Sequence, residues 1–160
     1  MYSMNSVHQN LYNMKLSFPF LTLLIAFTSC SPGSADKKIP ELANEMCGCF
    51  DEFQQSLSAE AKDLMKAVSM AANPQTEMMQ GMSKLKPEEA ASFSEKLKSI
   101  GTKGSEVYNC MEAFDKKHAK ETTKDKKALT EKLLTEMQAI GNCPTGAAIV
   151  NLSLSSGVIK

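Results

Sequence analysis

Cysteines are the residues of this chain whose number and spacing point most directly to chemistry. The chain has five cysteines. Cys30 belongs to an N-terminal segment that is considered separately below, and the remaining four are Cys47, Cys49, Cys110 and Cys143. An even number of cysteines in an exported chain is typical of disulfides, so we expect two of them here. A bridge within the Cys-Gly-Cys motif would instead be strained and oxidising, and suited to thiol–disulfide exchange. A four-cysteine zinc site is a further alternative, although zinc sites usually space their cysteines differently.

Methionines form a second cluster with chemical potential. Met78, Met79 and Met82 lie at helical spacing within the segment 76–85. Thioether sulfur is a soft ligand that suits Cu(I), so copper handling at these three residues is one hypothesis. Methionine also fills irregular gaps between helices, and a Met-lined groove can accept an apolar partner. We expect core packing here and keep the other two readings as alternatives.

The remaining polar residues favour a protein without catalytic activity. His118 stands among lysines, where a histidine more often serves as a helix-end cation than as a base. The sequence has no G-x-S-x-G, H-E-x-x-H or C-x-x-C-H motif and no glycine-rich phosphate loop. Its 18 basic residues balance 18 acidic ones, and all the basic ones are lysine, which disfavours nucleic-acid recognition. We therefore predict no enzyme activity, no cofactor and no nucleic-acid partner. The lysine-rich stretch 116–132 is expected to be a solvated face, with contact to anionic lipid headgroups as the alternative.

The first thirty residues have the pattern of a targeting segment. Lys15 precedes the apolar stretch 16–29, which is shorter than the roughly 20 residues of a membrane-spanning helix and is typical of a signal peptide. The stretch Ala26-Phe27-Thr28-Ser29-Cys30 resembles the lipobox of bacterial lipoproteins, in which the cysteine receives a diacylglycerol and becomes the mature N-terminus. Phe27 departs from the aliphatic residue usual in that family, and an ordinary secretory signal is the alternative.

The lipobox resemblance implies a division of the chain and a location. Residues 1–29 would be the signal peptide, with Met14 as the true start, and residues 30–38 a lipidated cysteine and its tether. The domain would sit in the periplasm or at the cell surface, held to the membrane by lipid on Cys30. Ser31, where an inner-membrane lipoprotein often has Asp, implies the outer membrane by analogy. The expected partners are the membrane itself and an envelope protein.

The chain after residue 38 predicts helices. Apolar residues recur every three or four positions from Pro40 to Leu57, which indicates one amphipathic helix. Ser58 is a suitable N-cap for a second helix, which Asn73-Pro74 should stop. The segment 76–85 follows. From Pro87 an unbroken apolar phase predicts one long helix over 87–119 with a weak point near Gly101. Two helices split at that glycine are the alternative.

The C-terminal third predicts one more long helix. After a polar connection at 120–127, apolar residues from Leu129 to Ile140 share one face, and Gly141 suits the C′ position. Beyond Cys143-Pro144 the pattern is weak, so we expect a partly helical segment with a fraying end and an ambiguous, strand-like stretch at 150–156. The prediction is an all-α bundle, with a helical domain at 39–150 and a tail at 151–160.

Helix geometry restricts how the cysteines pair. Cys47 and Cys49 are two positions apart on the first predicted helix, about 200° around its axis, so they should not bridge each other. One bridge should tie this helix to the long helix through Cys110, and the other should tie it to the C-terminal segment through Cys143. Which cysteine takes which partner stays open. The order Cys-Gly-Cys, then Val107 to Met111 around Cys110, then Cys143-Pro144 resembles a group of uncharacterised small helical exported proteins of Bacteroidota. That resemblance implies a shared fold and no particular activity.

Overall fold

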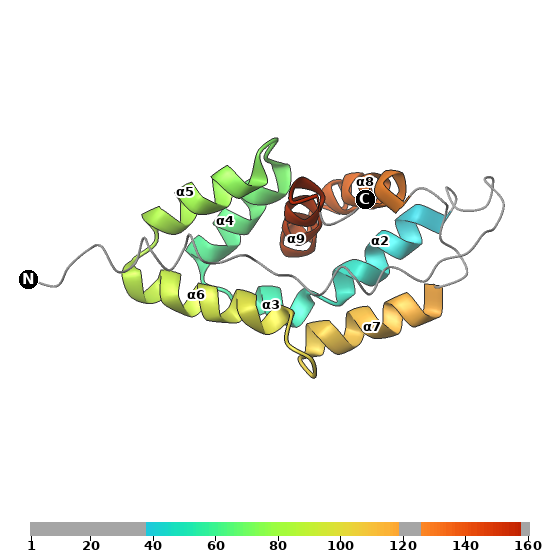
Figure 1. Ribbon diagram of the computed structural model, residues 1–160, viewed down its shortest axis with the longest axis horizontal. Coiled ribbons are helices and arrows are strands. Elements are labelled where there is room, and N and C mark those ends of the chain that lie inside the picture. Colours follow the sequence, from blue (N-terminus) through green and yellow to red (C-terminus); the bar gives the residue numbers. More distant parts are fainter. Residues whose placement is uncertain (1–37, 119–125, 158–160) are drawn as a thin grey trace, which may run out of the picture.

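The fold is built from helices joined by short turns. The computed structural model describes residues 38–118 and 126–157, so the proposed signal peptide, Cys30 and the tether up to residue 37 lie outside the described residues. The described part contains eight helices and no strand, which confirms the all-α prediction. These are α2 (Ile39–Gly48), α3 (Asp51–Gln55), α4 (Ala59–Met70), α5 (Pro74–Lys84), α6 (Pro87–Ile100), α7 (Glu106–His118), α8 (Lys126–Ile140) and α9 (Pro144–Ser155) (Figure 1). None of them is both long and apolar enough to cross a membrane.

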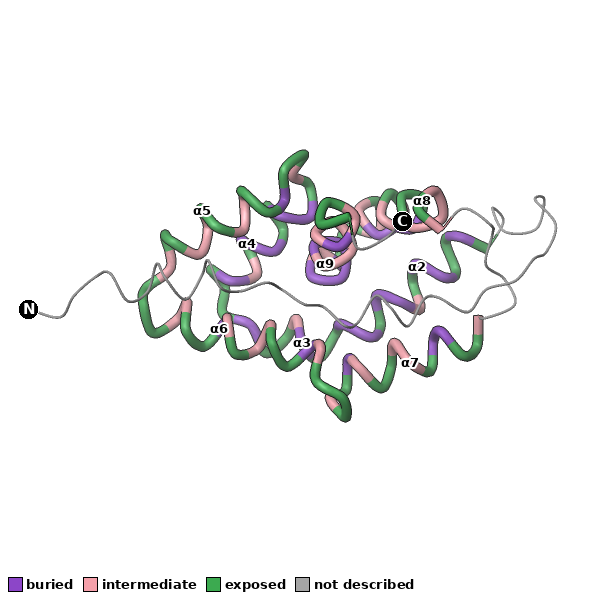
Figure 2. The backbone as a smooth tube through the Cα atoms, viewed as in Figure 1, coloured by how far each residue is buried: buried purple, intermediate pink, exposed green. Residues whose placement is uncertain are grey.

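The last helix, α9, lies at the centre of the bundle. It packs against α4, α5, α8 and α2, and Figure 2 shows much of its backbone buried. The residues that it buries are all small: Thr145, Gly146, Ala147, Ala148 and Ser153. Because neighbours cover α9 on several sides, it lacks the alternation of polar and apolar faces by which surface helices are recognised. The partly helical segment expected here is one continuous helix to Ser155, so the stretch at 150–156 that was ambiguous in the sequence is helical up to that residue.

Helices α4 and α5 form a hairpin beside α9, and their ends follow the sequence signals. The Ser58 hydroxyl accepts a hydrogen bond from the Ala61 N–H at 3.2 Å, which confirms the predicted N-cap. Helix α4 ends at Met70, before Asn73-Pro74, and Pro74 then begins α5. At this C-terminal end of α4, the side-chain amide of Asn151 donates to the carbonyl oxygens of Val68, Ser69 and Ala71, at 3.0, 3.3 and 3.0 Å. Helix α9 therefore supplies donors that the end of α4 lacks.

The first predicted helix is divided in two. The Cys49 N–H donates to Met46 O at 3.1 Å and the Phe50 N–H donates to Cys47 O at 2.9 Å. These bonds span three residues instead of four, so the chain tightens between α2 and α3. The apolar side chains along this stretch still face the core, among them Met46 in α2, Phe53 in α3 and Phe50 between the two helices.

The prediction of one long helix over 87–119 was wrong, and the split at Gly101 is what the structure contains. Helix α6 ends at Ile100 and α7 begins at Glu106. Between them Gly104 has a φ of 95°, a conformation that side chains other than glycine rarely adopt. The Ser105 hydroxyl then accepts a hydrogen bond from the Tyr108 N–H at 3.2 Å and caps the start of α7. The apolar phase survives the break, because the residues buried on either side of it keep a seven-residue spacing: Phe93, Ile100, Val107 and Phe114.

Helix α8 ends as the sequence indicates. Leu133 and Met137 are buried on its inner face. Gly141 follows its last residue with a φ of 73°, as expected for a glycine at C′. Of the predicted connection at 120–127, residues up to 125 lie outside the described residues, and α8 begins at Lys126.

Candidate functional site

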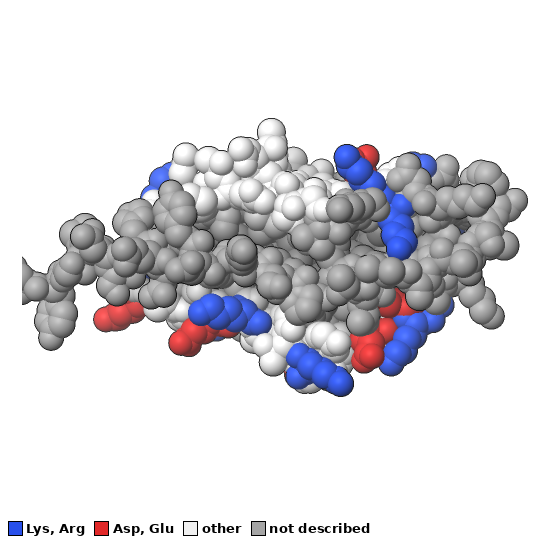
Figure 3. Space-filling model, in the orientation of Figure 1, with Lys and Arg blue, Asp and Glu red and all other residues white. Residues whose placement is uncertain are grey.

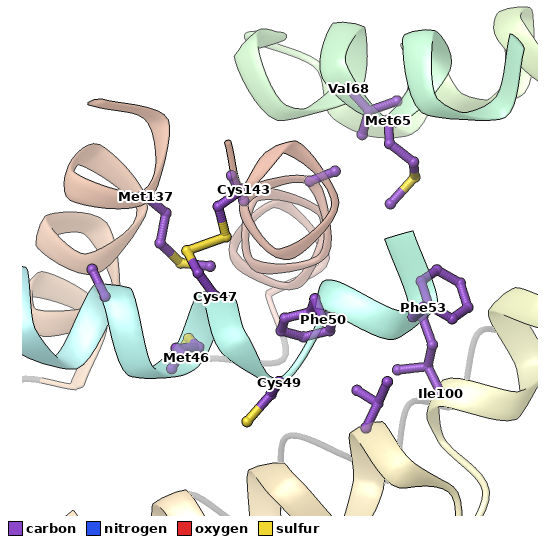
Figure 4. Packing of buried hydrophobic residues seen from close by; sticks show 14 of the residues in the cluster. Met46, Cys47, Cys49, Phe50, Phe53, Met65, Val68, Ile100, Met137 and Cys143 are labelled. Carbon is purple, nitrogen blue, oxygen red and sulfur yellow. A yellow bond between two sulfur atoms is a disulfide. The ribbon is translucent and has the colours of Figure 1, made fainter. Parts of the chain in front are cut away.

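Two disulfides diverge from the Cys-Gly-Cys motif. Cys47 bonds to Cys143 and Cys49 bonds to Cys110, with a Cα–Cα distance of 5.5 Å in each pair. Figure 4 shows the reason, since Cys47 points toward Cys143 and the Cys49 sulfur points the other way. The expected separation of the two cysteines is confirmed, and the pairing that the sequence left open is assigned. The four cysteines of the described ranges, 38–118 and 126–157, are all in these two disulfides, so this part of the chain has neither a Cys-x-Cys bridge nor a free cysteine that could bind zinc.

The Cys47–Cys143 disulfide belongs to the core. Cys47 is 7% exposed and Cys143 is 3% exposed. Where α9 crosses this bond, a Cβ on Gly146 would come within 2.7 Å of the Met137 methyl carbon and 2.9 Å of the Cys143 sulfur. Only glycine lets the helix approach so closely, because ordinary side-chain contacts are longer. This bridge therefore fixes the central helix against α2.

Gln54 holds the chain on both sides of Cys143. Its side-chain amide donates to Asn142 O at 3.2 Å, and its carbonyl oxygen accepts from the Thr145 N–H at 3.4 Å. Sequence reasoning missed this residue, because its partners lie far away along the chain and an isolated glutamine carries no signal. Helix α3 is thereby attached to the start of α9.

The Cys49–Cys110 disulfide borders a cleft of about 550 Å³, which we call the α3–α7 cleft. The cleft lies between α3 and the turn that joins α6 to α7, which Figure 1 shows beside each other. Phe53 and Val107 supply apolar surface, and the rest of the lining is mostly polar: Gly48, Glu52, Ser56, Ser99, Ser105 and Glu106. Cys49 is 7% exposed, but Cys110 is an exposed residue. Sulfur, carboxyl and hydroxyl groups thus face solvent together at this site.

Two carboxyl groups stand beside this disulfide. Glu52 follows Cys49 by three positions and Glu106 precedes Cys110 by four, so each lies about one helical turn from a bonded sulfur. A hydrogen bond from the Glu52 side chain, together with the like charge of that group, raises the pKa of Glu106. Two carboxylates this close repel each other unless a proton or a cation lies between them. The pair therefore favours a proton or a positively charged group in the cleft.

Neither known families, nor curated proteins, nor solved structures give a match to this chain. The site must therefore be interpreted from its own residues and geometry.

The three methionines do not share one face. Met78 and Met82 pack against the core, whereas Met79 is 61% exposed. Met79 and the 66% exposed Met70 lie on the α4–α5 hairpin, over which Figure 3 shows few charged side chains. Within the described ranges, no group of three or more His, Cys, Asp or Glu side chains is placed to hold a metal ion. The geometry favours the core-packing interpretation for Met78 and Met82.

His118 takes part in an ionic contact between α7 and α2. Its Nε2 lies 2.9 Å from Glu45 Oε2, and the Lys117 ammonium lies 2.8 Å from Glu45 Oε1. The hydrogen bond from Lys117, with a smaller effect from His118, lowers the pKa of Glu45 although partial burial opposes it. The histidine sits in the last turn of α7, where the sequence placed it. Its carboxylate partner was not foreseen.

Asp115 is a buried carboxyl on α7. The residue is 9% exposed, and its Oδ1 has no hydrogen-bond partner within the part of the chain that the structure describes. Burial raises the pKa of this carboxyl to about 6. Asp115 directly precedes the lysine-rich stretch 116–132, so its position in the sequence did not indicate burial.

Proposed function

We propose that this protein is a lipid-anchored, non-enzymatic binding module of the bacterial cell envelope, and that it contacts an envelope protein through the α3–α7 cleft. The observation that carries the proposal is the pair of closed disulfides, of which Cys49–Cys110 borders this cleft and Cys47–Cys143 lies in the core. Disulfides persist in oxidising compartments outside the cytosol, so they indicate an exported protein. The lipobox-like sequence before Cys30 supports attachment by lipid, and Ser31 supports the outer membrane.

The cleft has the composition of a binding surface more than that of a catalytic centre. Apolar area from Phe53 and Val107 lies next to hydroxyl groups and the carboxyl pair. Such a mixture of apolar contact and a few oriented polar groups is common in ligand and partner sites. The histidine of the described chain, His118, contacts Glu45 at the end of α7 and does not line the cleft. These features support recognition of a partner without chemistry.

The anchor is tested by the intact mass of the protein extracted from membranes. We expect a chain that starts at Cys30 and carries acyl groups, with no thiol that reacts before reduction. A Cys30→Ser variant serves as the control and should leave the membrane fraction. A full-length mass without acyl chains would contradict the anchor, and free thiols at Cys47 and Cys143 would contradict the two-bridge scaffold.

The binding surface is tested by photo-crosslinking in the producing cell. A photoreactive amino acid replaces Ser99, which lines the cleft, or Gln80, an exposed position of α5 that serves as the matched control. We expect a discrete adduct with one envelope protein from position 99 and none from position 80. The same adducts from both positions would refute the cleft as the contact surface.

A further inference from the structure

We propose that the Cys49–Cys110 disulfide is a reducible clasp on the α3–α7 cleft: a dithiol attacks Cys110, opens this bond while Cys47–Cys143 stays closed, and frees the start of α7. The inference goes beyond the binding function and does not depend on it. It follows from the contrast between the two disulfides, from the chemistry of exchange and from the few contacts that hold α7.

The two disulfides differ in access. Exchange requires a thiolate to reach a sulfur atom, so its rate depends on exposure. Cys110 is exposed, and both cysteines of its bond line the cleft. Cys47 and Cys143 are buried, and Phe50, Met137 and α9 surround their bond (Figure 4). An incoming thiol therefore meets Cys110 first.

The exchange reaction balances with a dithiol as the reductant. One thiolate of the dithiol bonds to the Cys110 sulfur, the S–S bond to Cys49 breaks, and Cys49 leaves as a thiolate that takes a proton from solvent in the open cleft. The second thiol of the reductant then attacks the mixed disulfide and releases Cys110 as a thiol. The dithiol becomes a disulfide, and the protein gains two thiols.

Reducing the Cys49–Cys110 disulfide should loosen the start of α7, at the cleft, more than the end of α7 near His118. Helix α7 packs mainly against α2 and α6. At its far end Glu45 still binds Lys117 and contacts His118. At the cleft end the bond is gone, and the like charge of Glu52, which raises the pKa of Glu106, opposes the close approach of the two side chains whenever both are ionised. The start of α7 and the turn before it should therefore move away from α3, so that reduction widens the cleft.

The test is a time course of reduction on the folded, full-length protein. Dithiothreitol is added without denaturant, samples are alkylated with iodoacetamide, and labelled peptides are measured by mass spectrometry. We expect Cys49 and Cys110 to be labelled roughly tenfold or more faster than Cys47 and Cys143, because a thiol reacts according to its accessibility. Equal rates for the two pairs, or faster labelling of Cys47 and Cys143, would overturn the proposal.

A second measurement follows the movement. Hydrogen exchange of the amides at 101–110 should increase on selective reduction, whereas exchange at 144–155 should stay unchanged. The increase should be smaller in a Glu106→Gln variant, which removes one of the repelling charges. Glu112→Gln, which alters a carboxylate of α7 paired with Lys116, is the matched control and should behave as the wild type. Unchanged exchange at 101–110 after Cys49–Cys110 is reduced would show that this bond restrains nothing.

Discussion

Replacing Asp115 with asparagine is expected to stabilise the protein above pH 6 and to change little near pH 4. The aspartate is 9% exposed and its Oδ1 has no hydrogen-bond partner among the described residues. A charge held there lacks the water that would stabilise it. Asparagine has nearly the same shape without the charge, so the substitution isolates the cost of ionisation.

The size and sign of the effect follow from the two pKa values of Asp115. Its ordinary value is 3.8, and in the folded protein burial raises the pKa to about 6. Below pH 3.8 both states hold the proton and stability is unaffected. Between pH 3.8 and about 6 the unfolded chain has ionised while the folded chain still holds the proton, so stability is lost progressively across this window, and the loss is complete once the pH has risen through the folded pKa. The difference of about two pKa units corresponds to roughly 3 kcal/mol, reached near pH 7 and above.

Urea unfolding of both proteins between about pH 4 and 8 measures this difference. The free energy of unfolding of the Asp115→Asn variant, minus that of the wild type, should rise with pH and level off near 3 kcal/mol, on the order given by the pKa shift. Subtracting the two curves cancels other titrating groups, such as Glu45. Asp63→Asn, at an exposed position of α4, is the control and should show no such rise. A pH-independent difference for Asp115→Asn would refute the reasoning.

Further substitutions test the scaffold. Replacing Cys47 and Cys143 together by serine removes a bridge with a sequence separation of 96. Because Cys49–Cys110 stays closed inside that loop and shortens it, the chain-entropy relation gives a loss of about 4 kcal/mol in the free energy of unfolding, measured by denaturant titration. A loss below about 1 kcal/mol would contradict the role of this bridge as a major restraint. Gly146→Ala should lower the free energy of unfolding by roughly 1–3 kcal/mol in the same assay, because the added Cβ would crowd Met137 and Cys143. An unchanged free energy of unfolding would show that the core accommodates the extra methyl group. Asn151→Ala should lower the free energy of unfolding by about 1–3 kcal/mol and speed hydrogen exchange near the end of α4, because the carbonyl groups there lose their donor. Exchange at the wild-type rate would contradict the capping role of Asn151.

Features governed by neighbouring residues could be predicted from the sequence. Ser58 caps α4 because its hydroxyl reaches an N–H only three positions away. Gly141 adopts a positive φ because the end of α8 requires it locally. Cys47 and Cys49 do not form a disulfide with each other because their spacing directs their side chains to different sides of the backbone. In each case the residues that determine the feature lie within about one helical turn of each other, so the local sequence is enough to predict it.

Features governed by distant partners could not be predicted. The apolar phase continues through the turn at Gly104, so periodicity alone predicted a helix where the backbone breaks. Helix α9 looked weakly patterned because it is surrounded by other helices. The contacts of Gln54 with Asn142 and of Asn151 with the end of α4 join residues far apart in the chain. The α3–α7 cleft depends on the same kind of long-range contact, so only its cysteines were identified in advance.

The bond between Cys47 and Cys143 also determines how the protein responds to tension. A force that pulls on residues 38 and 157 crosses this bond, so only 38–47 and 143–157 can lengthen, by at most about 90 Å for about 25 extended residues. Without the bond, and with Cys49–Cys110 still closed, about 60 residues could be extended to roughly 210 Å. Helices α3 to α8 lie inside the covalent loop that the bond closes. In a protein tethered through Cys30, tension would therefore extend only the two terminal segments. The helices that build the cleft would not bear the force.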